Sequence, residues 1–189
     1  MRITWGILAV SVLALTGCAT ATSASPSASA KTPAPSPTTT TKAEIGESIC
    51  KDEAADSTAK TVDIDQVRLL SDGKLMFMTF NTVADVPTTG RVLYSVTAWS
   101  PDGKTGYQFG TKFQNGKETD NFVFNISKAK QENITNGAVA ADKQVSARYP
   151  LAQLAGLGDK FSWSATVTVD GTDVDRCPGG EAKTQFPNT

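Results

Sequence analysis

The feature that most constrains the fold is a strict alternation of apolar and polar side chains near the C-terminal end of the chain. In residues 161–169 (FSWSATVTV) every odd position is apolar and every even position is serine or threonine. Successive side chains of a β-strand point to opposite faces, so this segment predicts a strand with one buried row of side chains and one solvent-exposed row. Trp163 belongs to the inward row and is predicted to lie in the core.

Similar patterns recur from residue 62 onward, separated by turns that contain glycine. The predicted strands are 62–69, 74–81, 91–100, 107–113, 121–127, 133–140, 143–149 and 161–169. Residues 150–158 carry the one helical pattern after Lys60, over one or two turns. These segments predict an all-β fold, a single antiparallel β-sandwich of about eight strands with jelly-roll or immunoglobulin-like topology.

Composition divides the 189 residues into four parts. Residues 1–17 have the character of an export signal, residues 43–178 hold the strands, and residues 179–189 are predicted to be a loose tail. Residues 18–42 contain, after the first cysteine, only Ala, Ser, Thr, Pro and Lys. Such a segment cannot bury enough apolar surface to offset its chain entropy, so it is predicted to be a disordered linker.

The N-terminal part combines a positive charge at Arg2 with an apolar run over residues 7–15, which is typical of a secretory signal and too short to span a bilayer. The sequence LTGC at residues 15–18 resembles the lipobox of bacterial lipoproteins. That resemblance implies cleavage before Cys18, a diacylglyceryl group on its thiol, and a lipid anchor on the extracytoplasmic face of the cell membrane. The alternative is an ordinary signal peptide followed by an unrelated cysteine.

The two other cysteines, Cys50 and Cys177, lie near the two ends of the predicted domain. In an exported protein such a pair is predicted to form a structural disulfide. A redox pair or a metal thiolate site is the alternative. Redox pairs usually have Cys-x-x-Cys spacing, and a metal site needs more ligands than these two.

Several function classes have little support in the sequence. The formal net charge is −1 and no basic tract follows the signal, which argues against binding to nucleic acid. Histidine is absent, and neither a nucleophile elbow nor a phosphate loop occurs. We therefore predict no catalytic residues, no cofactor and no enzymatic activity; a hydrolase with two facing carboxylates is the remaining enzymatic alternative.

Two Asp-x-Asp pairs, Asp63/Asp65 and Asp173/Asp175, raise the question of a hard cation such as calcium. In a regular strand each pair shares one face, and the second pair, beside Cys177, can approach the first. Aspartates in strands more often form a solvated outer face. The spacing is not that of an EF-hand loop, so we predict no metal site.

The segment 63–177 resembles, in the order of its elements, the DOMON-like and family-9 carbohydrate-binding-module-like β-sandwiches. The resemblance rests on a strand pair linked through Asp102-Gly103, and on a Pro-Leu-x-x-Leu element (150–154) placed before the strand at 161–169. It implies binding of sugars or haem. Histidine is absent, and Met76 and Met78 are predicted to be core residues, so a glycan or another small ligand is the predicted partner. Immunoglobulin-like sandwiches are the alternative family.

Sugar binding needs an aromatic face beside polar groups, because pyranose rings stack on aromatic rings while their hydroxyls form hydrogen bonds. Trp99 ends a predicted strand and lies opposite the row that contains Val92 and Val96. We predict a ligand site at Trp99 with Asn81 or Gln108; partly buried packing of Trp99 is the alternative. The predicted function is a non-catalytic binding module, and the alternative is an interaction or scaffold protein of the cell envelope.

Overall fold

Antiparallel strands build the part of the chain that the structure, a computed structural model, describes, which is residues 45–135 and 137–188. In chain order the strands are β1 (Gly46–Lys51), β2 (Ile64–Ser71), β3 (Leu75–Thr82), β4 (Arg91–Trp99), β5 (Gly106–Gln114), β6 (Lys117–Asn125), β7 (Lys130–Asn133), β8 (Val139–Ala141), β9 (Gln144–Pro150), β10 (Phe161–Val169), β11 (Thr172–Cys177) and β12 (Thr184–Phe186). The helical pattern after β9 is one 3-10 turn, η1 (Leu151–Leu154).

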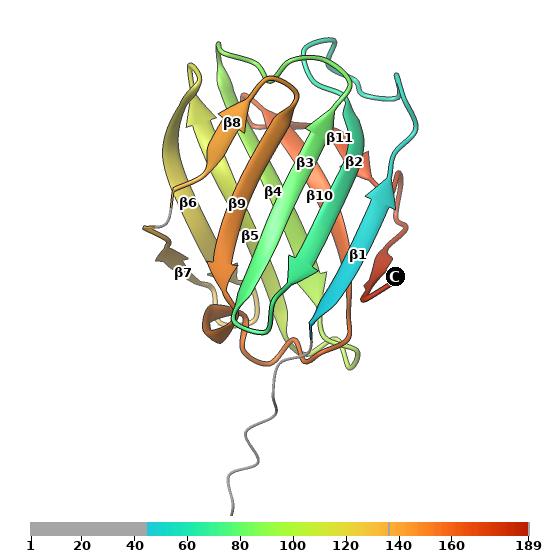
Figure 1. Cartoon of the computed structure of the whole chain (residues 1–189), viewed down its shortest axis with the longest axis vertical. Coiled ribbons are helices and arrows are strands. Elements are labelled where there is room, and N and C mark those ends of the chain that lie inside the picture. Colours follow the sequence, from blue (N-terminus) through green and yellow to red (C-terminus); the bar gives the residue numbers. More distant parts are fainter. Residues whose placement is uncertain (1–44, 136, 189) are drawn as a thin grey trace, which may run out of the picture. The chain divides into compact units, whose positions relative to one another are not determined.

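The strands form two sheets that face each other. Sheet A has the order β1-β2-β3-β9-β8, and sheet B has the order β11-β10-β4-β5-β6-β7. Sheet A lies in front in Figure 1 and sheet B crosses behind it. β12 pairs with the first part of β10, on the edge where β11 pairs with the remainder. The predicted all-β class and antiparallel sandwich are confirmed.

The structure has more strands than the predicted eight because weakly patterned segments also pair. Residues 133–140, predicted as one strand, contribute to β7 and β8, which lie in different sheets. Residues 179–189, predicted to be a loose tail, contain β12, in which Phe186 pairs with Phe161 and is buried. Strands of three or four residues are too short to show a period of two, so the pattern gave no sign of them.

The core lies between the sheets and takes one row of side chains from each central strand. The inward row of β10 is buried from Phe161 to Val167, as its alternation predicts. Met76 and Met78, on β3, are also buried, which confirms their assignment to the core. Side chains of this size each contribute about 1.5–3 kcal/mol when fully buried, so these rows hold the two sheets together.

Specific contacts connect the two sheets across this core. The ring centroid of Phe80 on β3 lies 5.4 Å from that of Tyr94 on β4, in an edge-to-face arrangement. Trp163 on β10 is fully buried, and its indole Nε1–H donates a 2.9 Å hydrogen bond to the hydroxyl of Ser48 on β1. The predicted core position of Trp163 is confirmed, and its polar atom is satisfied from the opposite sheet.

One edge of the sandwich is closed by a disulfide and by β12. The bond joins Cys50 on β1 to Cys177 on β11, with Cα atoms 6.0 Å apart, which confirms the predicted pairing. The Ser48 hydroxyl donates to the carbonyl of Gln185 at 2.6 Å, and the side chain of Asn188 bonds both the N–H and the carbonyl of Ile49. We call the region formed by Ser48, Cys50, Cys177, Gln185 and Asn188, with the contacts that link them, the disulfide edge.

Some predictions concern residues outside the described part of the chain. The signal at 1–17, the lipidated Cys18 and the linker through residue 42 all lie there, so they stay predictions. Among the residues that the structure describes, no helix has the length and apolar character needed to cross a bilayer.

Candidate functional site

A shallow polar groove runs over the outer face of sheet B, the face turned away from the viewer in Figure 1. It has a volume of about 210 Å³. Short hydroxyl side chains of β10 and β4 form its floor, namely Ser164, Thr166, Thr168, Ser95 and Thr97. These residues belong to the wetted rows of the two strands, and their small size leaves room above the sheet. Longer side chains at either side give the groove its walls.

Trp99 forms one end of this groove. It is directly opposite Gly106 in the pairing of β4 with β5. A Cβ atom on Gly106 would lie only 2.5 Å from Cζ3 of the indole, so the ring rests over the glycine backbone and uses the space that a side chain would fill. Trp99 is half-buried and lines the groove. The glycine thus gives the sheet a flat aromatic surface at this point.

Polar side chains are held around the hydroxyl floor by hydrogen bonds to one another. The amide of Gln108 donates to the Ser95 hydroxyl at 3.2 Å, and the guanidinium of Arg176 donates to the Ser164 hydroxyl at 3.0 Å. These contacts fix the two long side chains in place. The resulting surface combines an amide, a guanidinium and several hydroxyls, which supply both donors and acceptors to a ligand.

The far side of the groove carries charges of both signs. Asp173 accepts a 2.6 Å hydrogen bond from the Thr168 hydroxyl, and Lys183 completes the wall. Nε of Arg176 is buried without a hydrogen-bond partner in the protein. Opposite charges on a partly open wall suit a polar ligand with several hydroxyl groups better than a strongly charged one.

The structure brings together two of the three predicted ligand residues. Trp99 and Gln108 both line the groove. Asn81 does not: it lies on β3 in sheet A, where its side-chain oxygen accepts a 3.0 Å hydrogen bond from Gln144 on β9. Of the two predicted alternatives, Gln108 lies with Trp99 and Asn81 does not, because the sheet to which β3 belongs does not follow from the alternation of side chains.

The sequence pattern did not identify the charged residues of the groove. Arg176 and Asp173 reach it from β11, through the register Thr166↔Arg176 and Thr168↔Asp173. The only sequence signal for this face was the Ser/Thr row of residues 161–169, which was interpreted as wetted surface. The pairing of β10 with β11 turns that row into the floor of a groove.

The pair Asp173/Asp175 does not share one face, in contrast to the prediction. The register of β10 with β11 shifts between Val167 and Thr168, which is a β-bulge. A bulge breaks the alternation of side chains, so Asp173 points to the groove while Asp175 is buried near the disulfide edge. Asp175 therefore belongs to a second polar cluster.

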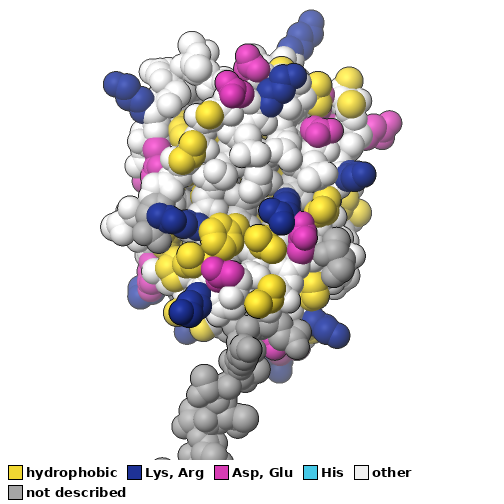
Figure 2. All heavy atoms as spheres, viewed as in Figure 1, with side chains coloured by type: hydrophobic (Ala, Val, Ile, Leu, Met, Phe, Trp, Pro, Cys, Tyr) yellow, Lys and Arg dark blue, Asp and Glu magenta, His cyan; other side chains and the backbone are white. Residues whose placement is uncertain are grey.

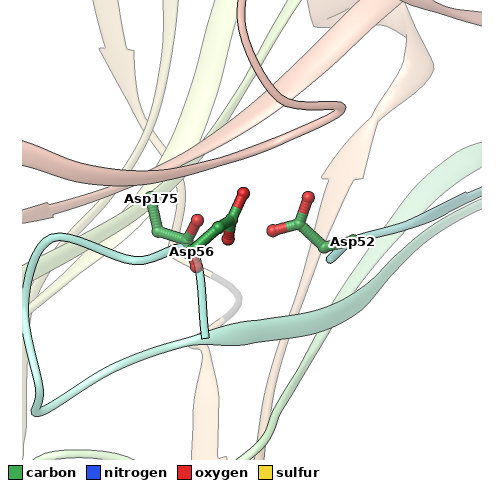
Figure 3. Close-up of side chains that lie close together, drawn as sticks. All are labelled: Asp52, Asp56 and Asp175. Carbon is green, nitrogen blue, oxygen red and sulfur yellow. The ribbon is translucent and has the colours of Figure 1, made fainter. Parts of the chain in front are cut away.

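That second cluster contains three carboxylates, Asp52, Asp56 and Asp175, shown in Figure 3. Oxygens of the three residues lie within 4.8 Å of one another. Burial, followed by the charges of Asp175 and Asp56, raises the pKa of Asp52 to about 7. Burial also raises the pKa of Asp175. The cluster therefore binds a proton at a higher pH than isolated aspartates do.

Backbone amides tie the acidic cluster to the fold. The N–H of Ile64 donates to one oxygen of Asp175 at 2.6 Å, and the N–H of Arg176 donates to the other at 2.8 Å. Nearby, Asp63 accepts a 2.8 Å hydrogen bond from the N–H of Ala55. Because both oxygens of Asp175 accept backbone hydrogen bonds, we interpret the cluster as a structural element that links β11 to β2.

Comparison of the chain with protein-family models, with curated proteins and with solved structures finds no match. The likeness to DOMON-like and family-9 carbohydrate-binding-module-like domains stays a prediction, and function is inferred from the geometry of the groove.

Proposed function

We propose that this protein is a lipid-anchored, extracytoplasmic binding module that takes a glycan in the groove over sheet B. The observation that carries the proposal is the indole of Trp99, which rests on the backbone of Gly106 and borders a floor of hydroxyl groups. A sugar ring presents an apolar face of C–H groups and a rim of hydroxyls. The groove offers an aromatic surface for the first and hydrogen-bonding groups for the second.

The polar residues of the groove suit the hydroxyls of a sugar. Each sugar hydroxyl both donates and accepts a hydrogen bond. The amide of Gln108 and the guanidinium of Arg176 supply donors, and the carboxylate of Asp173 supplies an acceptor. Hydrogen bonds to charged groups are stronger than those between neutral groups, so Arg176 and Asp173 would orient the ligand. A shallow groove on a sheet face also admits a chain of sugars that extends beyond it.

The proposed anchor is the diacylglyceryl group on Cys18. A single acyl chain gives only marginal membrane binding, whereas two chains give stable anchoring. The linker of residues 19–42 would reach about 75 Å if fully extended at ~3.1 Å per residue, which would leave the groove accessible to polymers around the membrane. Metabolic labelling with a fatty acid tests the anchor: label should enter the wild-type protein and be absent from Cys18→Ala.

A glycan array tests the binding function, using the full chain and two matched aromatic variants. Trp99→Ala should weaken binding to any glycan that the wild type recognises by about tenfold, or ~1.4 kcal/mol, since the stacking surface is lost. Phe77→Ala, on the outer face of sheet A, should leave binding unchanged. An absence of glycan binding by the wild type, or equal binding by Trp99→Ala, would contradict the proposal.

A second candidate function, recognition of another envelope protein, is favoured by the outer face of sheet A. Hydrophobic side chains gather there in Figure 2. Leu70 and Phe77 are cross-strand neighbours, both half-buried, and Arg148 flanks Phe77 on β9. Apolar groups rimmed by charge are typical of protein contacts. Crosslinking in cells separates the two functions: a protein partner on this face would be lost in Phe77→Glu and retained in Trp99→Ala.

A further inference from the structure

An apolar cavity opens at one end of the sandwich, and its lining residues are separate from those of the groove and of the acidic cluster. Its volume is about 500 Å³, within the range of sites that take small molecules. Buried side chains from both sheets and from the loop after β9 form its walls, chiefly Met76, Leu154, Leu157, Phe161 and Phe186. The polar side chains among its lining residues are those of Ser71 and Asp159.

Two features hold the cavity open. The rings of Phe161 and Phe186 stack with centroids 4.6 Å apart and form one wall. On the other side, the Tyr107 hydroxyl donates a 2.7 Å hydrogen bond to the carbonyl of Ala155, which fixes the loop that forms the opposite wall. Gly156, at φ +96°, turns the chain there in a conformation that other residues rarely adopt. The loop therefore cannot collapse into the cavity without breaking these contacts.

We propose that this cavity binds a single lipid acyl chain whose head group is uncharged, as in a monoacylglycerol. A flexible apolar chain is the ligand class that such walls remove most favourably from water. The half-exposed carboxylate of Asp159 selects the head group. It would repel the carboxylate of a free fatty acid, and it would accept a hydrogen bond from a glyceryl hydroxyl.

The start of the domain, at β1, bears on where a lipid ligand would come from. Gly46, the first residue of β1, packs against Phe186 and Pro187, so β1 begins beside the cavity wall. The choice of a membrane lipid as source rests on the proposed anchor. Binding itself does not, because the cavity is formed entirely by described residues of the domain.

The test uses the full chain with Cys18→Ala, which carries no acyl group of its own, and monopalmitoylglycerol as the probe. Native mass spectrometry should show a one-to-one complex. Ala155→Trp should fill the cavity and weaken binding at least tenfold. Ala152 is an exposed residue of η1 that does not line this cavity, so the Ala152→Trp variant should bind the probe as the parent does. No complex with the parent, or equal weakening by both tryptophans, would overturn the proposal.

Two further measurements test the head-group choice and separate the cavity proposal from the glycan proposal. At pH 8 the parent should bind palmitate at least tenfold more weakly than monopalmitoylglycerol. The Asp159→Asn variant should show a smaller difference in affinity between the two lipids. Equal binding of the two lipids by the parent, or an unchanged difference in Asp159→Asn, would overturn the role of Asp159. Trp99→Ala should bind monopalmitoylglycerol normally, so failure of the cavity proposal and failure of the glycan proposal are distinguishable.

Discussion

The disulfide edge and the groove over sheet B both concentrate polar side chains, but they use them in opposite ways. At the edge, Ser48 and Asn188 bond to backbone groups of neighbouring strands. In the groove, the half-buried side chains of Gln108 and Arg176 bond to the hydroxyls of Ser95 and Ser164. Polar groups that bond the backbone of a neighbouring segment join the two segments and contribute to stability, whereas polar groups that bond only other side chains can exchange these partners for a ligand. Variants at the edge should therefore change stability alone, and variants in the groove should change binding alone.

The largest effect on stability should come from removal of the disulfide. The bond between Cys50 and Cys177 closes a loop with a sequence separation of 127 residues. A crosslink over a loop of this length restricts the unfolded chain by roughly 4–5 kcal/mol in the entropy model. Chemical denaturation of Cys50→Ala/Cys177→Ala should show a loss of that order, while glycan binding below the melting temperature is retained. A loss of binding by the folded variant would break the separation between edge and groove.

A smaller loss should follow from Ser48→Ala. The Ser48 hydroxyl is fully buried, donates to the carbonyl of Gln185 and accepts the indole N–H of Trp163. Its removal leaves the buried indole N–H of Trp163 without a partner and takes one bond from the Gln185 carbonyl, at a cost of about 1–3 kcal/mol. Ser146→Ala, on the outer face of sheet A, is the matched control and should change the free energy of unfolding by less than about 0.5 kcal/mol. Equal effects of the two substitutions would contradict the assigned role of Ser48.

The acidic cluster beside the disulfide edge predicts that the stability of the fold depends on pH. The pKa of Asp52 rises from 3.8 to about 7 in the folded protein, chiefly through burial. Because the folded state holds the proton more tightly than the unfolded state, this contribution to stability is complete below about pH 4 and is lost as the pH rises to about 7. The raised pKa of Asp175 acts in the same direction.

Asp52→Asn measures that contribution directly. In thermal melts between pH 4 and pH 8, the melting temperature of the variant relative to that of the wild type should increase as the pH rises. Most of this increase should be complete near pH 7. Groups elsewhere titrate equally in both proteins, so their effects cancel in the difference. A difference in melting temperature that stays constant across this pH range would show that the pKa of Asp52 is not raised in the folded protein.

The fold was predictable because its evidence is local. The alternation over residues 161–169 identified β10 and the position of Trp163 without any knowledge of the other strands, and the compartment implied by the signal led to the disulfide. β12 was not predictable, since three residues are too few to show a period and its partners Phe161 and Ser48 are distant in sequence.

The candidate site was only partly predictable because it depends on pairing between strands. Trp99 and Gln108 line the same groove because they lie on adjacent strands joined by a short turn. Asn81 was misplaced because nothing in its own strand tells which sheet it joins. Arg176 and Asp173 were missed because a bulge decides which side of β11 faces the groove. The residues of a site on a sheet face thus depend on strand order, which the alternation of side chains along one sequence does not reveal.

The most direct test of glycan binding uses the two tryptophans that remain after removal of residues 1–17. In an NMR spectrum of the ¹⁵N-labelled processed chain, Trp99 and Trp163 each give one indole N–H signal. On titration with a glycan that the array identifies, the Trp99 signal should shift, and the buried Trp163 signal should stay in place. A titration in which neither signal moves, or in which the changes map to the outer face of sheet A, would contradict the proposed groove.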